Sequence, residues 1–384
     1  MKQSPIRILT AVPICDGHDS AISTINLELI RAGIEVIYLG YHRSVRDIVR
    51  AAIQEDVRGV GISSYNGGHV EFFSEVVKQL RKNGAREIGV FGGGGGTITE
   101  TDARVMHKHG VDRVFMAGTP LSAIVEYVAT KYRKAPPGKG AKAGSDRWIS
   151  QILSKSSAGK PREPAAKVIG ITGPGGAGKT TLIDELVLRF LKVRDDFRIA
   201  ILSHDPSIVA GGALLGDRAT MIHSQNDRVF MRSLATHGQA GGLSPETSGM
   251  LRTLKSMPFD VILIETVGTG QEAMPFTNGS VDHSIFVTSP EYGSQLQLQK
   301  IAMLDLADVI VVNKSDLAGG ARASSEIGQR IGSNHREQTV VSTIAKRHGD
   351  AGVDQLLELI APSTPSPGTP GEGRGGGPRA RVRV

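Results

Sequence analysis

A glycine-rich stretch in the middle of the chain has the residue types and spacing of a phosphate-binding loop. Residues 173–180 read Gly-Pro-Gly-Gly-Ala-Gly-Lys-Thr, which fits the pattern G-x-x-x-x-G-K-S/T. A strand is predicted immediately before it, at Val168–Thr172, and a helix immediately after it, at Thr181–Leu191. Glycines allow backbone N–H groups to point at phosphate oxygens at a helix N-terminus. The alternative is a strand–helix turn that holds no ligand.

The side chains of this loop have distinct expected roles. Lys179 would reach the β- and γ-phosphates, and the Thr180 hydroxyl would ligate Mg²⁺. The residues of this segment expected to contact a nucleotide are Gly173, Gly175, Gly176, Ala177, Gly178, Lys179, Thr180 and Thr181.

A second motif makes the expected nucleotide specific. Asn313-Lys314-Ser315-Asp316 follows the predicted strand Val309–Val312 and has the N-K-x-D form that reads guanine in GTPases. A carboxylate at Asp316 can accept both the N1–H and the N2–H of guanine, which adenine does not supply together. Asn313, Lys314 and Asp316 therefore predict a guanine nucleotide, and Ser342 is a further candidate for contact with the base.

Acidic residues at the ends of other predicted strands could hold Mg²⁺. Glu265-Thr-Val-Gly268 occupies the D-x-x-G position of GTPases, with Glu in place of the usual Asp. Glu265 could bind Mg²⁺ directly or through water, and the Gly268 N–H could meet the γ-phosphate, although a plain turn would also give this pattern. Asp205 is a second Mg²⁺ candidate or a capping residue, and Gln271 could orient a water. The expected catalytic residues are Lys179, Thr180, Glu265 and Gln271.

Another group of strand-end residues lies in the first third of the chain. Asp16-Gly17-His18 follows the first predicted strand, Ser63-Ser64-Tyr65 the third, and the glycine run Gly92–Gly96 the fourth. A neutral imidazole at His18 is a good ligand for a soft or borderline metal, and Asp16 could accept its other ring N–H. A surface histidine is the alternative. Because the three features meet at one sheet edge, they predict a large, deeply inserted ligand.

Two α/β units are needed to position these residues. Strand-like and helix-like segments alternate over residues 1–133 and again over residues 165–361, which indicates doubly wound parallel sheets. Residues 134–164 are expected to form a basic linker with a short helix. Residues 362–384 are rich in Pro, Gly and Arg and are expected to be disordered.

Composition narrows the function classes. The 384-residue chain carries a net charge of +7, but the excess lies in the linker and the tail, and only 4% of residues are aromatic. Nucleic acid is therefore not an expected partner. No apolar run reaches the roughly 18 residues of a membrane span, so no membrane partner is expected either. The single cysteine, Cys15, excludes an internal disulfide and favours a cytoplasmic location.

Residues 5–133 resemble the cobalamin-binding domain of B12-dependent acyl-CoA mutases. That family's pattern is D-x-H-x-x-G, then S-x-L, then G-G, and the matching residues are Asp16, His18, Ser63, Gly92 and Gly93. Ala21 and Tyr65 depart from it. The resemblance implies a flavodoxin-like fold and His18 as the lower cobalt ligand, backed by Asp16. Ser63, Tyr65 and the glycines would line the cofactor slot.

Residues 165–361 resemble the P-loop GTPase chaperone associated with methylmalonyl-CoA mutase. The residues that carry this resemblance are the loop at 173–180, Asp205-Pro206, the run 211–218, Glu265–Gly268 and Asn313–Asp316. The order of the two domains is similar to that in the fused isobutyryl-CoA mutases. The resemblance implies adenosylcobalamin, GTP/GDP and Mg²⁺ as cofactors.

One departure from these mutases shapes the functional interpretation. They continue into a substrate-binding TIM barrel of about 250 residues, and the sequence leaves no room for one. Mutase chemistry is therefore not expected on this chain alone. The leading interpretation is a GTP-hydrolysing module that loads or protects the adenosylcobalamin of a large mutase subunit supplied in trans. A homodimer and an adenosyltransferase are further candidate partners.

Three other interpretations stay open at this point. The chain could be a non-hydrolytic cobalamin-binding subunit, or a truncated fragment of a fused mutase whose tail comes from a frame-shifted gene. A cobalamin-dependent methyltransferase or light sensor shares the D-x-H domain, but the adjacent guanine-specific GTPase argues against that class.

Overall fold

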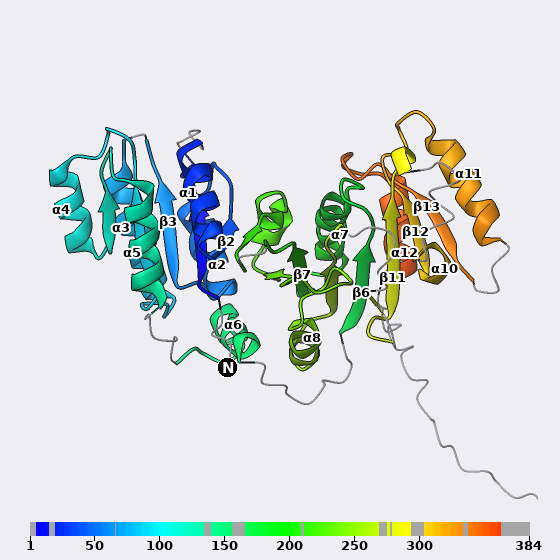
Figure 1. Ribbon diagram of the computed structural model, residues 1–384. Coiled ribbons are helices and arrows are strands. Elements are labelled where there is room, and N and C mark those ends of the chain that lie inside the picture. The colour runs from blue at the N-terminus through cyan, green and yellow to red at the C-terminus, as the bar shows by residue number, and fades with distance from the viewer. Residues whose placement is uncertain are drawn as a thin grey trace, which may run out of the picture.

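The computed structural model describes residues 5–14, 20–65, 67–133, 140–155, 166–208, 211–268, 275–276, 279–292, 303–332 and 337–361. These residues form two parallel β-sheets with helices on both faces, the α/β class that the sequence predicts. We call the first sheet with its helices the first unit, and the second sheet with its helices the second unit. Figure 1 shows the two units side by side in an elongated molecule.

The first sheet has the strand order β5-β4-β3-β1-β2-β8, with every neighbour paired in parallel. Its strands are β1 (Arg7–Ala11), β2 (Glu35–Tyr38), β3 (Gly59–Ser63), β4 (Gly89–Gly93), β5 (Arg113–Phe115) and β8 (Ala213–Leu215). Two helices pack on one face, α1 (Ser20–Arg31) and α5 (Leu121–Arg133). Three pack on the other, α2 (Val45–Gln54), α3 (His69–Lys82) and α4 (Glu100–His109).

The second sheet has the parallel strand order β13-β12-β11-β6-β10-β7-β9. Its strands are β6 (Lys167–Thr172), β7 (Ile199–Asp205), β9 (Val229–Ala235), β10 (Val261–Glu265), β11 (His283–Thr288), β12 (Val309–Val312) and β13 (Thr339–Ser342). Its helices are α6 (Asp146–Ser154), α7 (Lys179–Val193), α8 (Thr247–Lys255), α10 (Met303–Leu306), α11 (Gly320–Ile331) and α12 (Ala351–Ile360). Short 3₁₀ turns are η1 (Asp217–Ala219), η2 (Ile222–Gln225) and η3 (Pro290–Tyr292).

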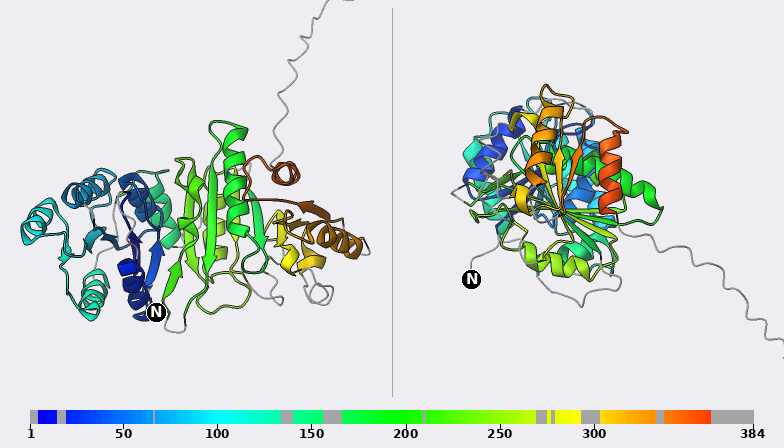
Figure 2. Two further views of the ribbon diagram at one scale, coloured as in Figure 1. Left: turned by 90° about the horizontal axis from the view of Figure 1, so that it is seen from above. Right: turned by 90° about the vertical axis from the view of Figure 1, so that its right-hand side faces the viewer.

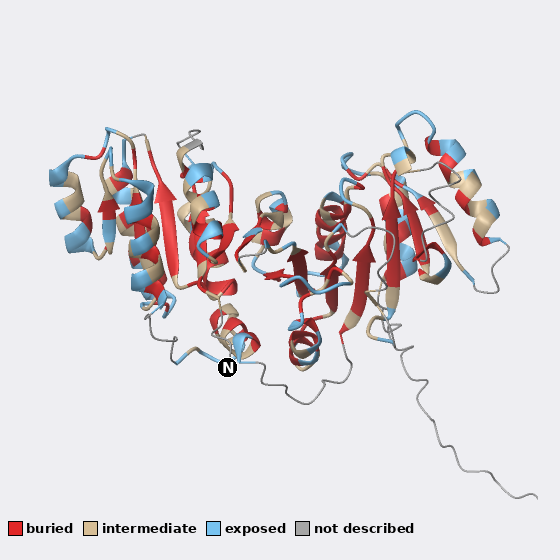
Figure 3. Ribbon diagram, viewed as in Figure 1, coloured by how far each residue is buried: buried red, intermediate tan, exposed pale blue. Residues whose placement is uncertain are grey.

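Apolar runs explain why these strands sit in the interior. Strands in a parallel sheet are covered on both faces, so their residues are apolar almost throughout rather than alternating. Figure 3 shows most strands of both sheets as buried, with exposed residues concentrated on the outer faces of the helices, although the edge strands β5 and β13 are only partly buried. Helix α2 begins at a capping box in which Ser44 and Asp47 exchange side-chain and backbone hydrogen bonds, and α4 begins at the same arrangement of Thr99 and Asp102.

The two units are joined by a strand and a buried helix, and not only by a linker. β8 lies between β7 and β9 in the sequence, yet it pairs with β2 as the edge strand of the first sheet. Helix α6, from the segment expected to be a linker, buries Ile149 and Leu153 in the apolar core under the second sheet. The left view in Figure 2 also places the two units directly against each other. None of the helices in the described part of the chain is long and apolar enough to cross a lipid bilayer.

Candidate functional site

The phosphate-binding loop lies between β6 and α7, in the predicted strand–loop–helix arrangement. Gly173, Gly176 and Gly178 have φ values of 146°, 77° and 89°, which residues with a Cβ rarely adopt. Gly178 is the N-cap of α7, so the positive end of that helix faces the loop. The remaining predicted contact residues in this segment are Gly175 and Ala177 in the loop, and Thr180 and Thr181 in the first turn of α7.

Lys179 is buried at the base of the loop. Only 7% of it is exposed, and its ammonium donates to the carbonyls of Gly173 (3.0 Å) and Pro174 (3.2 Å). Burial lowers the pKa of Lys179, and the nearby Glu265 and Asp217 carboxylates oppose that shift. The lysine therefore faces both phosphate-loop carbonyls and two acids from other elements.

The acids and hydroxyls below the loop form a compact oxygen-rich cluster. The Thr180 hydroxyl donates to Glu265 Oε1 at 2.7 Å. The buried Ser203 hydroxyl donates to Asp217, and it also lies 3.4 Å from Glu265 Oε2. Burial raises the pKa of Glu265, and the Asp217 charge raises it further. Carboxylate and hydroxyl oxygens suit Mg²⁺, so Thr180 and Glu265 fit the predicted magnesium site.

The second predicted magnesium ligand, Asp205, lies among the same acids, because burial and the Asp217 charge raise its pKa to about 7. Asp205 ends β7, and its Oδ2 accepts a hydrogen bond from the Gly216 N–H at 3.0 Å. Asp217, one residue beyond Gly216, is the acid that shares the Ser203 hydroxyl with Glu265. Among the described residues no three His, Cys, Asp or Glu side chains form a metal-binding group by themselves. A bound Mg²⁺ would therefore take other oxygen ligands as well.

His204 of β7 forms a hydrogen bond with the last residue of the neighbouring strand β10. Its Nδ1 bonds to the Glu265 carbonyl and its Nε2 to the Thr247 hydroxyl, both at 2.7 Å. Burial lowers the pKa of His204 to about 4, so the ring is neutral at pH 7. A neutral imidazole donates through one nitrogen and accepts through the other, which matches a carbonyl on one side and a hydroxyl on the other.

Gly268, the residue predicted to contact the γ-phosphate, packs closely against the phosphate loop. A Cβ at this position would lie 2.5 Å from Gly175 Cα, so only glycine permits the approach. Tyr292 of η3 also reaches the loop, because its hydroxyl donates to the Gly175 carbonyl at 2.6 Å. Gln271 lies outside the described residues.

The first residue of the predicted base-binding motif, Asn313, contacts the phosphate loop. Asn313 Nδ2 donates to the Ala177 carbonyl at 2.9 Å. Its Oδ1 accepts from the Thr343 hydroxyl and the Ala345 N–H, both at 3.0 Å. Asn313 therefore links the phosphate loop to the segment after β13.

The other residues of the base motif are charged and paired at the surface. Asp316 forms an ion pair with Lys346 at 2.7 Å, and this contact lowers the pKa of Asp316. Lys314 has a φ of 56° and lies 3.7 Å from Glu291. The Ser342 hydroxyl contacts Ser324 of α11 at 2.8 Å, so the structure directs Thr343 rather than Ser342 toward Asn313.

A cavity of about 340 Å³ opens at the carboxyl ends of β3 and β4, where the sequence predicts the second ligand. Predicted residues that line it are Ser63, Tyr65, Gly92 and Gly93. The rest of its wall is largely apolar and includes Thr10, Ile22, Phe91 and Met116. Asp16 and His18 lie outside the described residues. A mostly apolar slot with a hydroxyl at Ser63 fits the tail of a large cofactor.

The glycine run has a packing role that sequence reasoning missed. The prediction ends the fourth strand at Phe91, but β4 extends to Gly93, so Gly92 and Gly93 are strand residues. A Cβ at Gly92 would lie 2.0 Å from the Ile62 carbonyl, and one at Gly94 only 1.4 Å from the Ser64 carbonyl. These glycines are required by the close approach of β3 as well as by any ligand.

Asp217 is the functional candidate that the sequence prediction did not single out. It follows a three-residue strand and a glycine, and no periodic pattern marks it. Its place in the glycine-rich run at 211–218 was the available signal. Only the fold brings η1 beside Glu265.

Together, the loop between β6 and α7 and the Asn313 contacts define the second unit as a P-loop nucleotide-binding domain. Residues 143–365 match the family described as methylmalonyl-CoA mutase-associated GTPase MeaB, and residues 6–125 match the B12-binding domain. The chain belongs to the methylmalonyl-CoA mutase-associated GTPase family, and its first unit carries a B12-binding domain.

Similar proteins combine both domains in a longer chain. The fused isobutyryl-CoA mutase of Geobacillus kaustophilus is 37% identical over 92% of this chain and 36% of its own length. That of Cupriavidus metallidurans is 38% identical over 92% of this chain and 35% of its own. This chain therefore spans about a third of the relatives it matches. A crystal structure of HypB from Helicobacter pylori in complex with nickel aligns with 55% of this chain and 91% of its own, at 15% identity. The TM-score of that alignment is 0.39.

Proposed function

We propose that the chain is a GTP-hydrolysing, adenosylcobalamin-binding module that loads or protects the cofactor of an acyl-CoA mutase supplied in trans. The observation that carries the proposal is the junction of the two units. Strand β8, which lies in the sequence between β7 and β9 of the second unit, forms the edge strand of the first sheet, and Asp217, two residues after it, accepts a hydrogen bond from Ser203 of β7 below the phosphate loop. The isobutyryl- or methylmalonyl-CoA type of mutase and a cytoplasmic location belong to the same proposal.

In the proposed hydrolysis, water adds to the γ-phosphorus and the bond to the β-phosphate oxygen breaks. Mg²⁺ when bound neutralises the phosphate charge. The Lys179 ammonium would exchange its carbonyl partners for phosphate oxygens, and the Thr180 hydroxyl and Glu265 would hold the metal. The Gly268 N–H would stabilise the charge that develops on the γ-phosphate. Asp316 would select guanine, as proposed from the sequence.

In the first unit, the cavity at the β3 and β4 ends would hold the nucleotide tail of adenosylcobalamin. Ser63, Tyr65, Gly92 and Gly93 would line the tail, and His18 with Asp16 would supply the lower cobalt ligand. Adenosylcobalamin binding would be followed by its absorbance spectrum. The electron paramagnetic resonance spectrum of the Co(II) form should show an axial nitrogen that disappears in His18→Ala. An unchanged spectrum would remove the role of His18.

Phosphate release from GTP tests the catalytic part of the proposal. The purified chain should release phosphate from GTP only with Mg²⁺ present, and Lys179→Ala should lower the rate at least 100-fold, because it removes the cation nearest the phosphates. Undiminished turnover in Lys179→Ala would exclude the loop as the catalytic site. A wild-type chain that binds GTP and cobalamin but releases no phosphate would favour the alternative of a non-hydrolytic binding subunit.

A further inference from the structure

Arg218 directly follows Asp217, the acid that shares the Ser203 hydroxyl with Glu265, and it is the largest fully buried side chain among the described residues. Its guanidinium, which belongs to the second unit, makes hydrogen bonds to residues of both units. Nε donates to Glu55 Oε1 at 3.0 Å, and Nη2 donates to Gln54 Oε1 at 2.9 Å. Nη2 also donates to the Met231 carbonyl at 2.6 Å. The residue next to a nucleotide-site acid is therefore anchored at the end of α2, in the cobalamin-binding unit.

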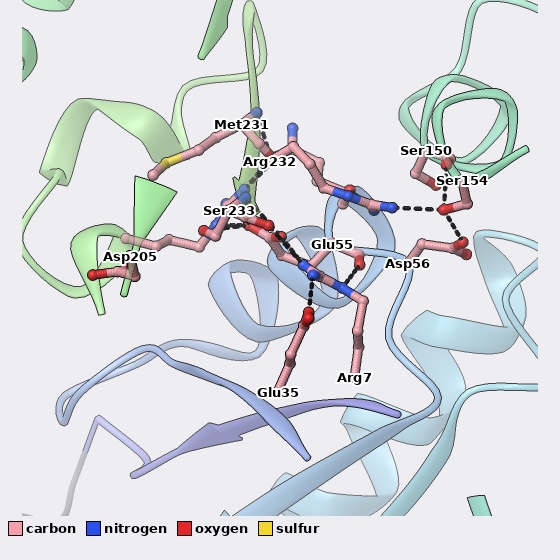
Figure 4. A network of polar contacts seen from close by, with 12 residues as sticks. Arg7, Glu35, Glu55, Asp56, Ser150, Ser154, Asp205, Met231, Arg232 and Ser233 are labelled. Atoms are coloured by element: carbon pink, nitrogen blue, oxygen red, sulfur yellow. Dashed lines mark hydrogen bonds and ion pairs between the residues drawn. The ribbon is translucent and has the colours of Figure 1, made fainter. Parts of the chain in front are cut away.

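Glu55 is the centre of this anchor. It is fully buried and accepts from Arg7 of β1 at 2.8 Å as well as from Arg218. It also accepts from the Ser233 N–H and hydroxyl of β9, each at 3.0 Å. Figure 4 shows Glu55 between Arg7 on the first unit and Ser233 on the second. One carboxylate thus ties strands of both sheets to η1.

The backbone of the same segment is held by the first unit as well. β8, two residues before Asp217, pairs in register with β2, from Glu35–Ala213 to Ile37–Leu215. On the other side of Arg218, the Ala219 carbonyl accepts from Arg43 Nη2 at 2.7 Å. Residues on both sides of Asp217 are therefore fixed to the cobalamin-binding unit, while its carboxylate accepts from Ser203 in the second unit.

Burial makes the Arg218–Glu55 ion pair difficult to separate. A charged pair out of water is stable only with its partners in place, and removing one partner leaves a charge uncompensated. Arg218 and Glu55 have no exposed surface, so neither can leave the other for water. Adjacent Cα atoms are about 3.8 Å apart, so a shift of the Arg218 backbone would also shift Asp217.

We propose that Glu55 is a positioning residue for the GTP reaction: through Arg218 it fixes Asp217 beside Glu265, so that the cobalamin-binding unit completes the GTPase site. The inference rests on the proposed function only in taking GTP and Mg²⁺ as the ligands. It adds that the GTPase site is built from both units, with Arg43 as a second, weaker support of η1.

The test uses Glu55→Gln in the full chain, because the amide keeps the shape and one acceptor while removing the charge. We expect the Mg²⁺ concentration for half-maximal GTP hydrolysis to rise about tenfold and kcat to fall about tenfold. Binding of a fluorescent GDP analogue in EDTA should be unchanged, since the phosphate loop is untouched. The matched control is Glu87→Gln, which breaks an ion pair between the first unit and Arg147 of α6 that includes no residue of η1. It should leave the Mg²⁺ dependence at the wild-type value.

Each outcome decides the inference. Wild-type Mg²⁺ dependence in a folded Glu55→Gln chain overturns it while leaving the proposed function intact, and an equal shift in Glu87→Gln also overturns it. If Glu55→Gln does not fold, Arg43→Met takes its place, because Arg43 is only half-buried; we expect a shift of about threefold, and no shift overturns the inference. If the wild-type chain hydrolyses no GTP, the catalytic proposal fails. The positioning role is then read from the tightening of GDP-analogue binding by Mg²⁺, which must be present in the wild type and smaller in Glu55→Gln.

Discussion

At the residue scale, His204 is a buried, neutral histidine that contributes to stability through two hydrogen bonds. Its ring bridges β10 and α8, and burial lowers its pKa to about 4. In the unfolded chain its pKa returns to about 6.5, so the unfolded state binds a proton that the folded state does not. Stability from this residue is therefore complete above pH 6.5 and is lost as the pH falls toward 4.

We expect His204 to make the chain less stable at pH 5 than at pH 7.5 by about 2 kcal/mol. Buried acids with raised pKa values act in the opposite direction, so the effect must be isolated by comparison with His204→Asn. Urea unfolding at both pH values gives the free energies of unfolding. The pH effect should be smaller by about 2 kcal/mol in the variant, and an identical pH effect in both chains would contradict the prediction.

Asp316 carries the second prediction at this scale. A carboxylate accepts two guanine N–H groups, whereas an amide in Asp316→Asn offers one acceptor and one donor. We expect the variant to bind GTP at least about tenfold more weakly and to gain affinity for xanthosine triphosphate, whose base has a carbonyl in place of the guanine amino group. Competition against a fluorescent guanine nucleotide measures both. Equal loss for GTP and xanthosine triphosphate would show that the change only damages the loop.

At the scale of elements, the pairing of β3 with β4 shapes the cavity of the first unit. A methyl group at Gly94 would overlap the Ser64 carbonyl, whereas one at Gly96 meets nothing within 4 Å. We expect Gly94→Ala to destabilise the chain by about 1–3 kcal/mol and to weaken cobalamin binding, because the strand ends must separate. Gly96→Ala, two residues away in the same run, should change stability by less than about 0.5 kcal/mol. Thermal unfolding and cobalamin titration compare the pair, and similar losses in both variants would be inconsistent with this account.

Elements also show how far sequence reasoning extends. The strands predicted at 168–172 and 309–312 agree with β6 and β12, because each is specified by its own run of apolar residues. The phosphate loop is equally local, since a strand, six loop residues and a helix are consecutive in the chain. The base motif was also visible, because its residues follow a strongly apolar strand.

The parts that could not be predicted depend on distant pairing. β8 has three residues and no local signal, and its partner β2 lies almost 180 residues earlier in the chain. Because the pairing of β8 with β2 positions Asp217, the spacing of residues in the sequence did not reveal that Asp217 lies near Glu265. Helix α6 was predicted, but not its burial, because the Lys/Gly-rich flanks suggested an exposed linker.

At the scale of the whole molecule, the buried charges between the units predict that the two units unfold together. Glu55 is shared by Arg7, Arg218 and Ser233, so unfolding of either unit alone would leave buried charge without its partners in the other. Removing one partner of a buried pair costs about 3–5 kcal/mol. This penalty opposes any state in which only one unit is folded. If the segment that contains β8 unfolded alone, the edge of β2 would also lose its partner strand.

We therefore expect a single cooperative thermal transition for the full chain. Far-UV circular dichroism follows both units, and fluorescence of the only tryptophan, Trp148 of α6, follows the junction. The two signals should give the same midpoint, and the calorimetric and van't Hoff enthalpies should agree. In Glu55→Gln the midpoints should separate, because the charge that links the units is gone, whereas Glu87→Gln should lower the midpoint without splitting it. Two transitions in the wild-type chain would mean that the units are independent and that the buried cluster does not couple them.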